Sequence, residues 1–406
     1  MFYSQQTTMP TELTNLYSEI AQDATLRLQS HVKHCIAEHG DISFAQYMQL
    51  ALYHPELGYY TRGQQNVGKS GDFFTSVSVG SCFGIILAHR IHSLWENQPN
   101  FNQAAPFHLI EIGANSGQLA KDILDTIQQQ FPNLYTQLRY HIAEHLEAAK
   151  LSQLNTLKNH QDRLTHHTEL AEISETQGII ISNELIDAFP VHLLQLQNNQ
   201  WNERLVTVEN DELTFILSEN LSPELEAFTQ TLPQDLPEGY QTEYRPAIDS
   251  FTQAARNALQ HSTTITIDYG HTHSAYYQPS RSTGTLRCYH QHQADEAPLD
   301  LPGLKDITAH VDFTQLANSY LNADHYLTHF SAQSHYLTTH ARDWLIQLEN
   351  ELTDEDASPQ QQQLAMKSIR QFQTLTHPTI MGHQFYILET STQSPSTPDT
   401  LALLEV

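Results

Sequence analysis

The chain is poor in cysteine, in basic residues and in long apolar runs. Its three cysteines form no C-x-x-C pair and leave an odd thiol among 406 residues, which favours a reducing compartment over a disulfide-stabilised secreted fold. Lysine and arginine total 19 against 46 acidic residues, and the net charge of −27 opposes binding to the phosphates of a nucleic acid. No segment approaches the ~18 consecutive apolar residues of a membrane-spanning helix.

The first ten residues also lack the features of a targeting segment. MFYSQQTTMP has neither the basic and apolar parts of a signal peptide nor the arginines of a transit peptide, and the first arginine is Arg27. We therefore expect a cytoplasmic, bacterial-type protein. At ~100–200 residues per domain, the chain is long enough for two or three packed lobes. The acidic excess suits a solvated surface or a basic protein substrate, and the sequence does not indicate an oligomeric state.

A glycine-marked loop joins an apolar strand to an amphipathic helix between Phe107 and Leu119, which read FHLIEIGANSGQL. Such a loop lies at the carboxyl end of a parallel strand and at the amino end of a helix, where α/β sheets bind ligands. The dinucleotide pattern G-x-G-x-x-G fails, because Asn115 and Gln118 occupy its second and third glycine positions. The sequence therefore predicts a nucleotide-type ligand without the dinucleotide fingerprint.

The pattern that does stand is E-x-G-x-x-x-G, formed by Glu111, Gly113 and Gly117. It resembles the first motif of S-adenosyl-L-methionine (SAM) methyltransferases, usually E/D-x-G-x-G-x-G. Asn115 replaces the middle glycine, and asparagine is among the non-glycine residues that most readily adopt a left-handed backbone conformation. The resemblance implies that Glu111, Gly113, Asn115 and Gly117 bind SAM.

Two further strands are expected to end beside this loop. Gln137 to Glu144 ends in a carboxylate, where such folds place an acid that accepts hydrogen bonds from the ribose hydroxyls. Glu144 is therefore a candidate cofactor ligand, and its alternative is a solvated residue at the start of the next helix. The apolar run Gly178 to Ile181 is followed by the polar residues Ser182, Asn183 and Glu184.

Six motifs resemble the MidA family, whose mitochondrial members are arginine methyltransferases that help to assemble respiratory complex I. Ser182 to His192, SNELIDAFPVH, is similar to the family signature N-E-(L/F)-(L/F)-D-A-(L/F)-P-V-H. The other motifs, in the family's order, are HPELGYY at His54–Tyr60, GDFFT at Gly71–Thr75, IDYG at Ile267–Gly270, GTLR at Gly284–Arg287 and PGLKDIT at Pro302–Thr308. The resemblance runs from about Asp41 to Phe313. One departure is Ala114-Asn115-Ser116, where the family commonly has Pro-Gly-Arg.

The resemblance implies a class I methyltransferase-like doubly wound α/β sheet with an N-terminal helical lobe and an inserted or C-terminal α+β lobe. The expected parts are 1–105, the helical lobe with a cofactor-covering G-D-F segment; 106–205, the SAM-binding Rossmann-like core; 206–261, a helical insertion with a β-hairpin; 262–390, the returning core strands with a C-terminal substrate lobe; and 391–406, a disordered tail. Gly71, Asp72 and Thr75 are expected to contact the cofactor from the first part.

Individual segments carry their own patterns. Apolar spacing predicts helices at 13–39, 44–53, 77–95 and 341–352, and a polar, largely helical segment at 221–260. Alternating patterns predict a β-hairpin or meander at 191–217, a strand at 263–268 and a closing strand at 385–389.

The resemblance also implies a site for the methyl acceptor at Asn183, Glu184, Asp187 and His192. An arginine acceptor is a difficult one because its guanidinium has a pKa of ~12.5 or above. Carboxylates must hold the planar group and direct one nitrogen toward the methyl group. Glu184 and Asp187 are the candidates for this role, although Asp187 could instead stabilise the amino terminus of its own helix.

Three functions stay open on the sequence alone. The first is SAM-dependent protein arginine methylation linked to complex I assembly, with a protein substrate such as a complex I subunit. The second is methylation of a small molecule or of another protein group by the same fold. The third is a SAM-binding assembly factor that acts by contact and catalyses little.

Two other motifs are not expected to be functional. Gly63 to Ser70, GQQNVGKS, satisfies the P-loop pattern, but no apolar strand precedes it and Gly71 follows directly, where a helix should begin. The pairs His271-x-His273 and His290-x-His292 lack the spacing of a zinc site. We therefore expect a flexible loop, polar surface histidines and no metal.

Overall fold

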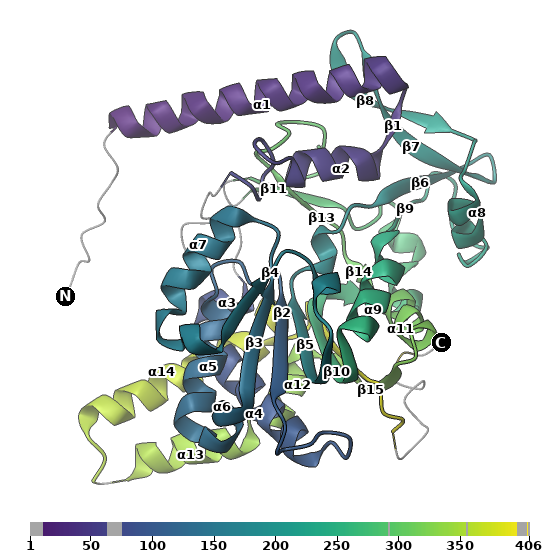
Figure 1. Ribbon diagram of the computed structural model, residues 1–406. Helices are drawn as coiled ribbons and strands as arrows, with labels where there is room; N and C mark the ends of the chain where they lie inside the picture. Colours follow the sequence, from purple (N-terminus) through teal and green to yellow (C-terminus); the bar gives the residue numbers. More distant parts are fainter. Residues whose placement is uncertain (1–10, 63–74, 291–292, 355, 396–403, 405–406) are drawn as a thin grey trace.

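The computed structural model describes residues 11–62, 75–290, 293–354, 356–395 and 404 of the chain. Its largest element is a sheet of apolar strands that alternate with helices along the sequence (Figure 1). In spatial order the strands are β4 (Leu164–His167), β3 (Leu138–Ala143), β2 (Phe107–Ile112), β5 (Glu175–Asn183), β10 (Leu259–His271), β16 (Phe385–Ser391) and β15 (Tyr326–Ala332), with β14 (Val311–Asp312) beside β10.

Strands β4, β3, β2, β5 and β10 run parallel, and β16 is antiparallel to both of its neighbours, β10 and β15. Numbered along the chain, the seven strands have the spatial order 3-2-1-4-5-7-6. The predicted class I methyltransferase-like α/β sheet is therefore confirmed, and so are the expected strands at 263–268 and 385–389.

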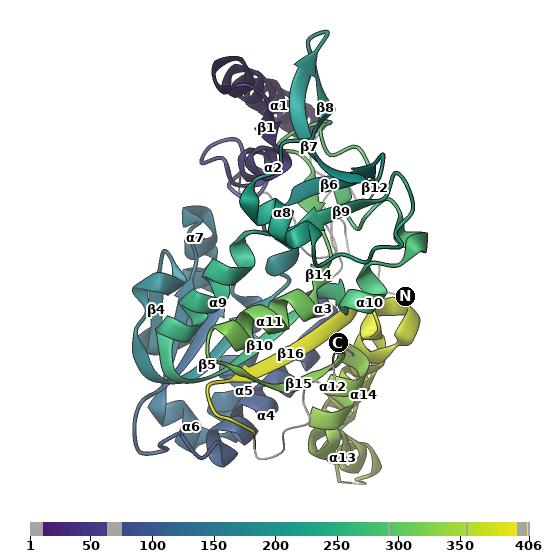
Figure 2. The same ribbon diagram turned by 90° about the vertical axis from the view of Figure 1, so that its right-hand side faces the viewer.

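Helices cover both faces of this sheet because successive strand residues point to opposite sides. Leu109 of β2 packs in one apolar cluster, and the next residue, Ile110, packs in the other. The first cluster includes residues of α4 (Cys82–Asn97), α5 (Gln118–Gln130), α12 (Gln333–His340), α13 (Arg342–Thr353) and α14 (Pro359–Thr376). The second includes residues of α9 (Ala247–Ala258) and α11 (Phe313–Asn322). Figure 2 shows the two sets on either side of β16.

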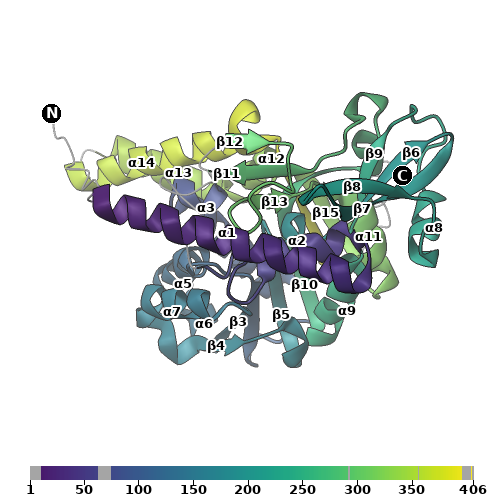
Figure 3. The same ribbon diagram turned by 90° about the horizontal axis from the view of Figure 1, so that it is seen from above.

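A second lobe lies above the carboxyl edge of the sheet (Figures 1 and 2). It contains α1 (Thr11–His39), α2 (Phe44–Tyr53) and an antiparallel sheet of β1 (Ile42–Ser43), β6 (His192–Gln197), β7 (Gln200–Glu209), β8 (Glu212–Ser218) and β9 (Gln241–Tyr244). A smaller sheet joins β11 (Arg287–His290), β12 (Gln293–Asp295) and β13 (Asp306–Thr308). Seen from above, α1 crosses the molecule beside α2 (Figure 3).

The meander predicted at 191–217 is confirmed, and its turns explain its register. Asn198 and Asn199 have φ of 54° and 59° between β6 and β7, and Asn210 and Asp211 have φ of 51° and 67° between β7 and β8. Two successive left-handed residues favour a tight hairpin that matches the strand twist. The polar pairs in the sequence therefore fix which residues of the meander lie opposite one another.

The remaining elements connect these layers. They are the helices α3 (Ser76–Val79), α6 (Pro132–Gln137), α7 (Glu147–Thr156), α8 (Pro223–Thr229) and α10 (His273–Tyr276), and the short turns η1 (Lys158–Arg163), η2 (Leu170–Glu172), η3 (Ile186–Ala188), η4 (Pro279–Arg281) and η5 (Pro378–Gly382). None of the helices in the described ranges combines the length and the apolar composition that a membrane crossing needs.

Two element predictions need correction. The single helix expected at 77–95 is two helices, because Gly80, with φ of 137°, ends α3 and a new helix begins at Cys82. The polar segment 221–260 is not continuously helical, because β9 separates α8 from α9. The P-loop-like segment 63–70, Gly71, Asp72 and most of the expected tail lie outside the described residues.

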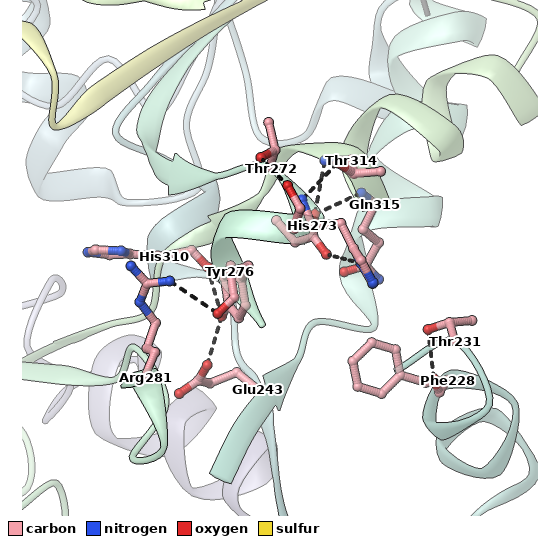
Figure 4. A network of polar contacts seen from close by, with 12 residues as sticks. Phe228, Thr231, Glu243, Thr272, His273, Tyr276, Arg281, His310, Thr314 and Gln315 are labelled. Atoms are coloured by element: carbon pink, nitrogen blue, oxygen red, sulfur yellow. Dashed lines mark hydrogen bonds and ion pairs between the residues drawn. The ribbon is translucent and has the colours of Figure 1, made fainter. Parts of the chain in front are cut away.

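A buried carboxylate joins the second lobe to the core at the end of β10. Glu243, on β9, accepts hydrogen bonds from the Tyr276 hydroxyl at 2.7 Å and from the Thr285 backbone N–H at 2.7 Å. Figure 4 shows Tyr276 between Glu243 and His310, with its own carbonyl oxygen accepting from Arg281. This network fixes the upper sheet relative to the core strands.

Candidate functional site

The glycine loop has the backbone that its sequence predicts. Gly113, Asn115 and Gly117 have φ of 68°, 49° and 78°, so the asparagine adopts the left-handed conformation expected of it. The Gly113 N–H donates to the Ala143 carbonyl oxygen at 3.0 Å, which holds the loop against the end of β3. A Cβ at Gly113 would stand 3.0 Å from the Leu185 Cδ1 atom, so the turn is narrow there.

The two acids assigned to the cofactor lie at the ends of neighbouring strands and are both buried. Glu111 accepts a hydrogen bond from the Tyr140 hydroxyl at 2.7 Å. Burial raises the pKa of Glu111 to about 7, and the nearby charge of Glu144 adds to this effect. Burial also raises the pKa of Glu144.

Gln153 of α7 fixes Glu144 to the loop, and the sequence interpretation missed it. The Gln153 side-chain amide donates to the Asn115 carbonyl oxygen at 2.9 Å and to the Glu144 carboxylate at 3.3 Å. The Leu146 N–H also donates to Glu144, at 3.1 Å. A fully buried glutamine on a helix is a signal that apolar spacing alone does not reveal.

The structure brings Asn183, Glu184 and Asp187 together at the end of β5 and in the turn that follows it. Glu184 has φ of 50°, a strained conformation for a residue with a side chain, and accepts a hydrogen bond from the Asn183 amide at 3.2 Å. Burial and the charge of Asp187 raise the pKa of Glu184 to about 8, although a backbone hydrogen bond from Ser76 opposes the shift. Residues that follow the G-D-F motif therefore contact the predicted acceptor site.

Thr75 is the described member of the expected cofactor-covering segment. Its hydroxyl caps α3 by accepting from the Ser78 N–H at 3.2 Å, and its side chain is buried. The next residue, Ser76, is fully buried and donates to Gln333 at 3.0 Å. The backbone at 75–76 is thus held between α12 and Glu184.

Asp187 lies in η3 and is buried. Burial raises its pKa to about 6, and the charge of Arg245 limits the rise. The Arg245 guanidinium donates to the backbone carbonyl oxygens of Ala309 at 2.8 Å and of His310 at 3.3 Å. Those contacts hold the arginine in place. It stabilises the Asp187 carboxylate through its charge, and its own hydrogen bond to Asp187 goes to the backbone carbonyl oxygen, at 3.5 Å.

Asp268, near the end of β10, positions the turn that follows Glu184 and contains Asp187, the two predicted acceptor acids. Its Oδ2 atom accepts from the backbone N–H groups of Leu185, Ile186 and Asp187 at 3.3, 2.9 and 3.3 Å. It is fully buried, and burial raises its pKa well above the ordinary value. Asp268 belongs to the D-Y-G motif, but only the fold shows that it contacts the turn at 185–187, some 80 residues earlier in the chain.

His192 is not joined to this group by any hydrogen bond among the described residues. It begins β6, and its Nδ1 atom lies 2.5 Å from the Glu203 Oε1 atom on β7. Its partner therefore belongs to the upper sheet. The catalytic role of His192 stays a prediction.

Aromatic residues of the second lobe face the acids from above. The Tyr53 hydroxyl of α2 donates to the Ala188 carbonyl oxygen at 2.9 Å, and the Tyr60 hydroxyl donates to the Asp306 carboxylate at 2.8 Å. The pKa of Tyr53 is raised by burial and by the charges of Asp306, Asp187 and Glu144. The same tyrosine therefore lies near both Glu144, the predicted cofactor ligand, and Asp187, a predicted acceptor ligand.

These residues fit SAM and a cationic acceptor. Because Gly113 has no side chain, a ligand can lie directly against the backbone of the loop. Buried Glu144 stands at the end of β3, the position from which such folds bind a ribose. Glu184, Asp187 and Asp268 form an acidic group in which Asp187 and Asp268 are buried and Glu184 is half-buried. Such a site can orient a cationic nucleophile and exclude water, and SAM supplies a methyl group already activated on a sulfonium.

Comparison with known proteins agrees with this geometry. Residues 86–331 match the model of a family of S-adenosyl-L-methionine-dependent methyltransferases. The chain is 28% identical over 333 residues to the mitochondrial protein arginine methyltransferase NDUFAF7 of Danio rerio, covering 76% of this chain and 75% of that protein. It is 26% identical over 302 residues to the homologue from Drosophila melanogaster, covering 68% of this chain and 65% of that protein.

A solved structure shares the whole fold. The crystal structure of a protein from Burkholderia thailandensis bound to S-adenosyl-homocysteine superposes with a TM-score of 0.82 at 27% identity, over 94% of this chain and 96% of that one. A second structure, of a native protein from the same organism, gives a TM-score of 0.79. With the family model matched over more than half of its length, the chain belongs to the family of S-adenosyl-L-methionine-dependent methyltransferases.

Proposed function

We propose that this methyltransferase acts on an arginine side chain of another protein. The observation that carries the proposal is the pair formed by half-buried Glu184 and buried Asp187, which lie close together and both have raised pKa values. Two such acids are costly to ionise in the free enzyme, and a bound guanidinium would stabilise both charges. The matched relatives, which are named protein arginine methyltransferases, support the same assignment.

Within this proposal, Glu111, Gly113, Asn115, Gly117 and Glu144 hold SAM. Glu184 and Asp187 hold the acceptor, Asn183 orients Glu184, and Asp268 positions their turn. We further propose, on the family resemblance, that the acceptor is a subunit of respiratory complex I. The cytoplasm is the proposed compartment, whereas the matched relatives are named mitochondrial.

The test is labelled methyl transfer from SAM into a lysate of cells that lack this protein, with the labelled residue located by mass spectrometry. Label on arginine supports the proposal, whereas label on another residue or on a small molecule contradicts it. A variant that transfers no methyl group but still restores the partner's assembly in cells would favour a contact-only assembly factor.

Asp187→Asn makes the assay specific to the site. It removes a charge-assisted hydrogen bond of ~1.5–3 kcal/mol, so single-turnover transfer should slow by roughly one to two orders of magnitude while SAM affinity stays unchanged. The exposed Asp343→Asn variant is the matched control and should transfer normally.

A further inference from the structure

Three histidines on neighbouring strands form a line of hydrogen-bonded rings on one face of the central sheet. The His108 Nδ1 atom of β2 lies 2.9 Å from the His141 Nε2 atom of β3, and the His141 Nδ1 atom lies 3.0 Å from the His167 Nε2 atom of β4. His108 and His141 are buried, at 7% and 5% exposure. The line is distinct from the acceptor site, because His108 lies in the first half of β2 and the cofactor loop follows its end.

A carboxylate stands at each end of this line. The Glu175 Oε2 atom, at the start of β5, lies 3.4 Å from the His108 Nε2 atom. The Glu172 Oε2 atom lies 3.9 Å from the His167 Nδ1 atom. His108 thus lies between two other potential metal ligands, since one ring nitrogen faces His141 and the other faces Glu175.

The donor atoms lie close enough together for a single ion to reach all three once the side chains adjust. One ligand atom from each of His108, His141 and Glu175 lies within 4.8 Å of the other two. Two imidazole nitrogens on one tetrahedral zinc ion stand roughly 3.3 Å apart, given Zn–N bonds of ~2.0–2.1 Å. The 2.9 Å between His108 and His141 needs to widen by only a few tenths of an ångström, and the partly exposed Glu175 side chain can adjust from the solvent side.

We propose that His108, His141 and Glu175 form a binding site for a divalent transition-metal ion, Zn²⁺ in particular. Two neutral imidazoles with one carboxylate are a donor set that zinc accepts, and they leave its fourth position for water. The ion would join β2, β3 and β5 at the end of the sheet remote from the cofactor loop. Its role there is to stabilise the sheet.

The surrounding groups prepare His141 as a ligand. Neutral histidine presents one lone pair, and metal binding needs that nitrogen unprotonated. If the His141 Nδ1–H donates to His167, its Nε2 atom is left for the metal, and Glu172 beyond His167 completes the outer shell.

The experiment uses the full chain, freed of metal, with Zn²⁺ as the probe. Calorimetry should show that the wild type binds one equivalent of Zn²⁺ tightly. Co²⁺ bound in place of Zn²⁺ should give the absorption spectrum of an ion with nitrogen and oxygen ligands. Glu175→Gln, at a partly exposed position that folding tolerates, should weaken this equivalent at least tenfold. His141→Gln should abolish it. Zinc should raise the melting temperature of the wild type but not that of the variants.

A matched control is needed because the chain has 25 histidines. His271 and His310 form another close pair, with 3.2 Å between the His310 Nδ1 and His271 Nε2 atoms, outside the proposed ligand set. His271→Gln should therefore leave the tight equivalent intact. Two results would refute the metal site: no stoichiometric zinc in the wild type, or zinc binding in Glu175→Gln and His141→Gln that is as tight as in His271→Gln. The line of histidines would then be only a series of hydrogen-bonded rings.

Discussion

At the scale of single residues, Gly113 is the position of the glycine loop, Gly113–Gly117, that tolerates a side chain least. Its left-handed backbone disfavours any β-branched residue, and a Cβ there would stand 3.0 Å from Leu185. We expect Gly113→Val to lower the affinity for SAM at least tenfold in calorimetry. Gly239→Val is the control, because Gly239 has φ of 82° but nothing within 4 Å of its added Cβ. Equal SAM affinity in both variants would remove Gly113 from the cofactor site.

Glu184 should set the pH dependence of methyl transfer. Its pKa of about 8 in the free protein means that the carboxyl is mostly protonated at neutral pH. Because a cationic acceptor needs the ionised form, kcat/KM should rise about tenfold per pH unit below pH 8 and level off above it. Glu184→Gln should lower kcat/KM above pH 8 and abolish its rise with pH below pH 8. A wild-type profile that is flat between pH 6 and pH 9 would contradict the assignment.

At the scale of elements, a buried ion pair fastens α4 to β16. The Arg90 guanidinium donates to both carboxylate oxygens of Glu389, at 2.8 and 2.6 Å, and the Tyr336 hydroxyl donates to the same group at 2.5 Å. Burial alone would raise the pKa of Glu389, but Arg90 outweighs it and holds the pKa below its ordinary value.

Arg90→Met should therefore lower the free energy of unfolding by about 3–5 kcal/mol, because it leaves the Glu389 charge buried without its partner. Urea denaturation measures the loss. Asp23→Asn, which breaks the exposed Arg27–Asp23 pair of α1, should cost less than about 1 kcal/mol. A loss below 1 kcal/mol in Arg90→Met would show that the pair does not hold α4.

Local signals in the sequence account for much of this architecture. Helix α2 has the predicted bounds, 44–53, because Ser43 and Gln46 form a capping box at its start. The break at Gly80 was missed because the apolar spacing continues through it, while a side chain there would collide with Gln371 from a distant helix. Glu111, Gly113 and Gly117 could be proposed as cofactor ligands because one short segment contains all three.

The rest of the site depends on contacts between distant segments. Gln153, Asp268 and Arg245 act on the loop and on η3 from other elements. No local pattern marks these roles, although Asp268 lies in the D-Y-G motif. The histidine row is hidden for the same reason, because 33 and 26 residues separate its members and only the parallel register aligns them.

At the scale of the whole molecule, the charge of −27 should oppose folding through mutual repulsion. We expect the urea midpoint at pH 7.5 to rise when NaCl increases from 0.05 to 0.5 M, because salt screens the exposed charges. The same change of salt near the pI of about 5.2 is the control and should shift the midpoint little. A lower midpoint in high salt at pH 7.5 would mean that attractive ion pairs outweigh the repulsion.

The position of β16 has a consequence for the protein during its own synthesis. This strand, at residues 385–391, fills the space between β10 and β15, so it is an interior strand that is made after both of its neighbours. At ~5–20 residues per second, a ribosome needs roughly 6–24 s to proceed from the end of β10 to the end of β16. Throughout that interval the nascent chain presents an unpaired strand edge, which can template pairing with other chains. The growing polypeptide is therefore exposed to aggregation at an edge that the finished enzyme does not have, and it needs a chaperone most in those seconds.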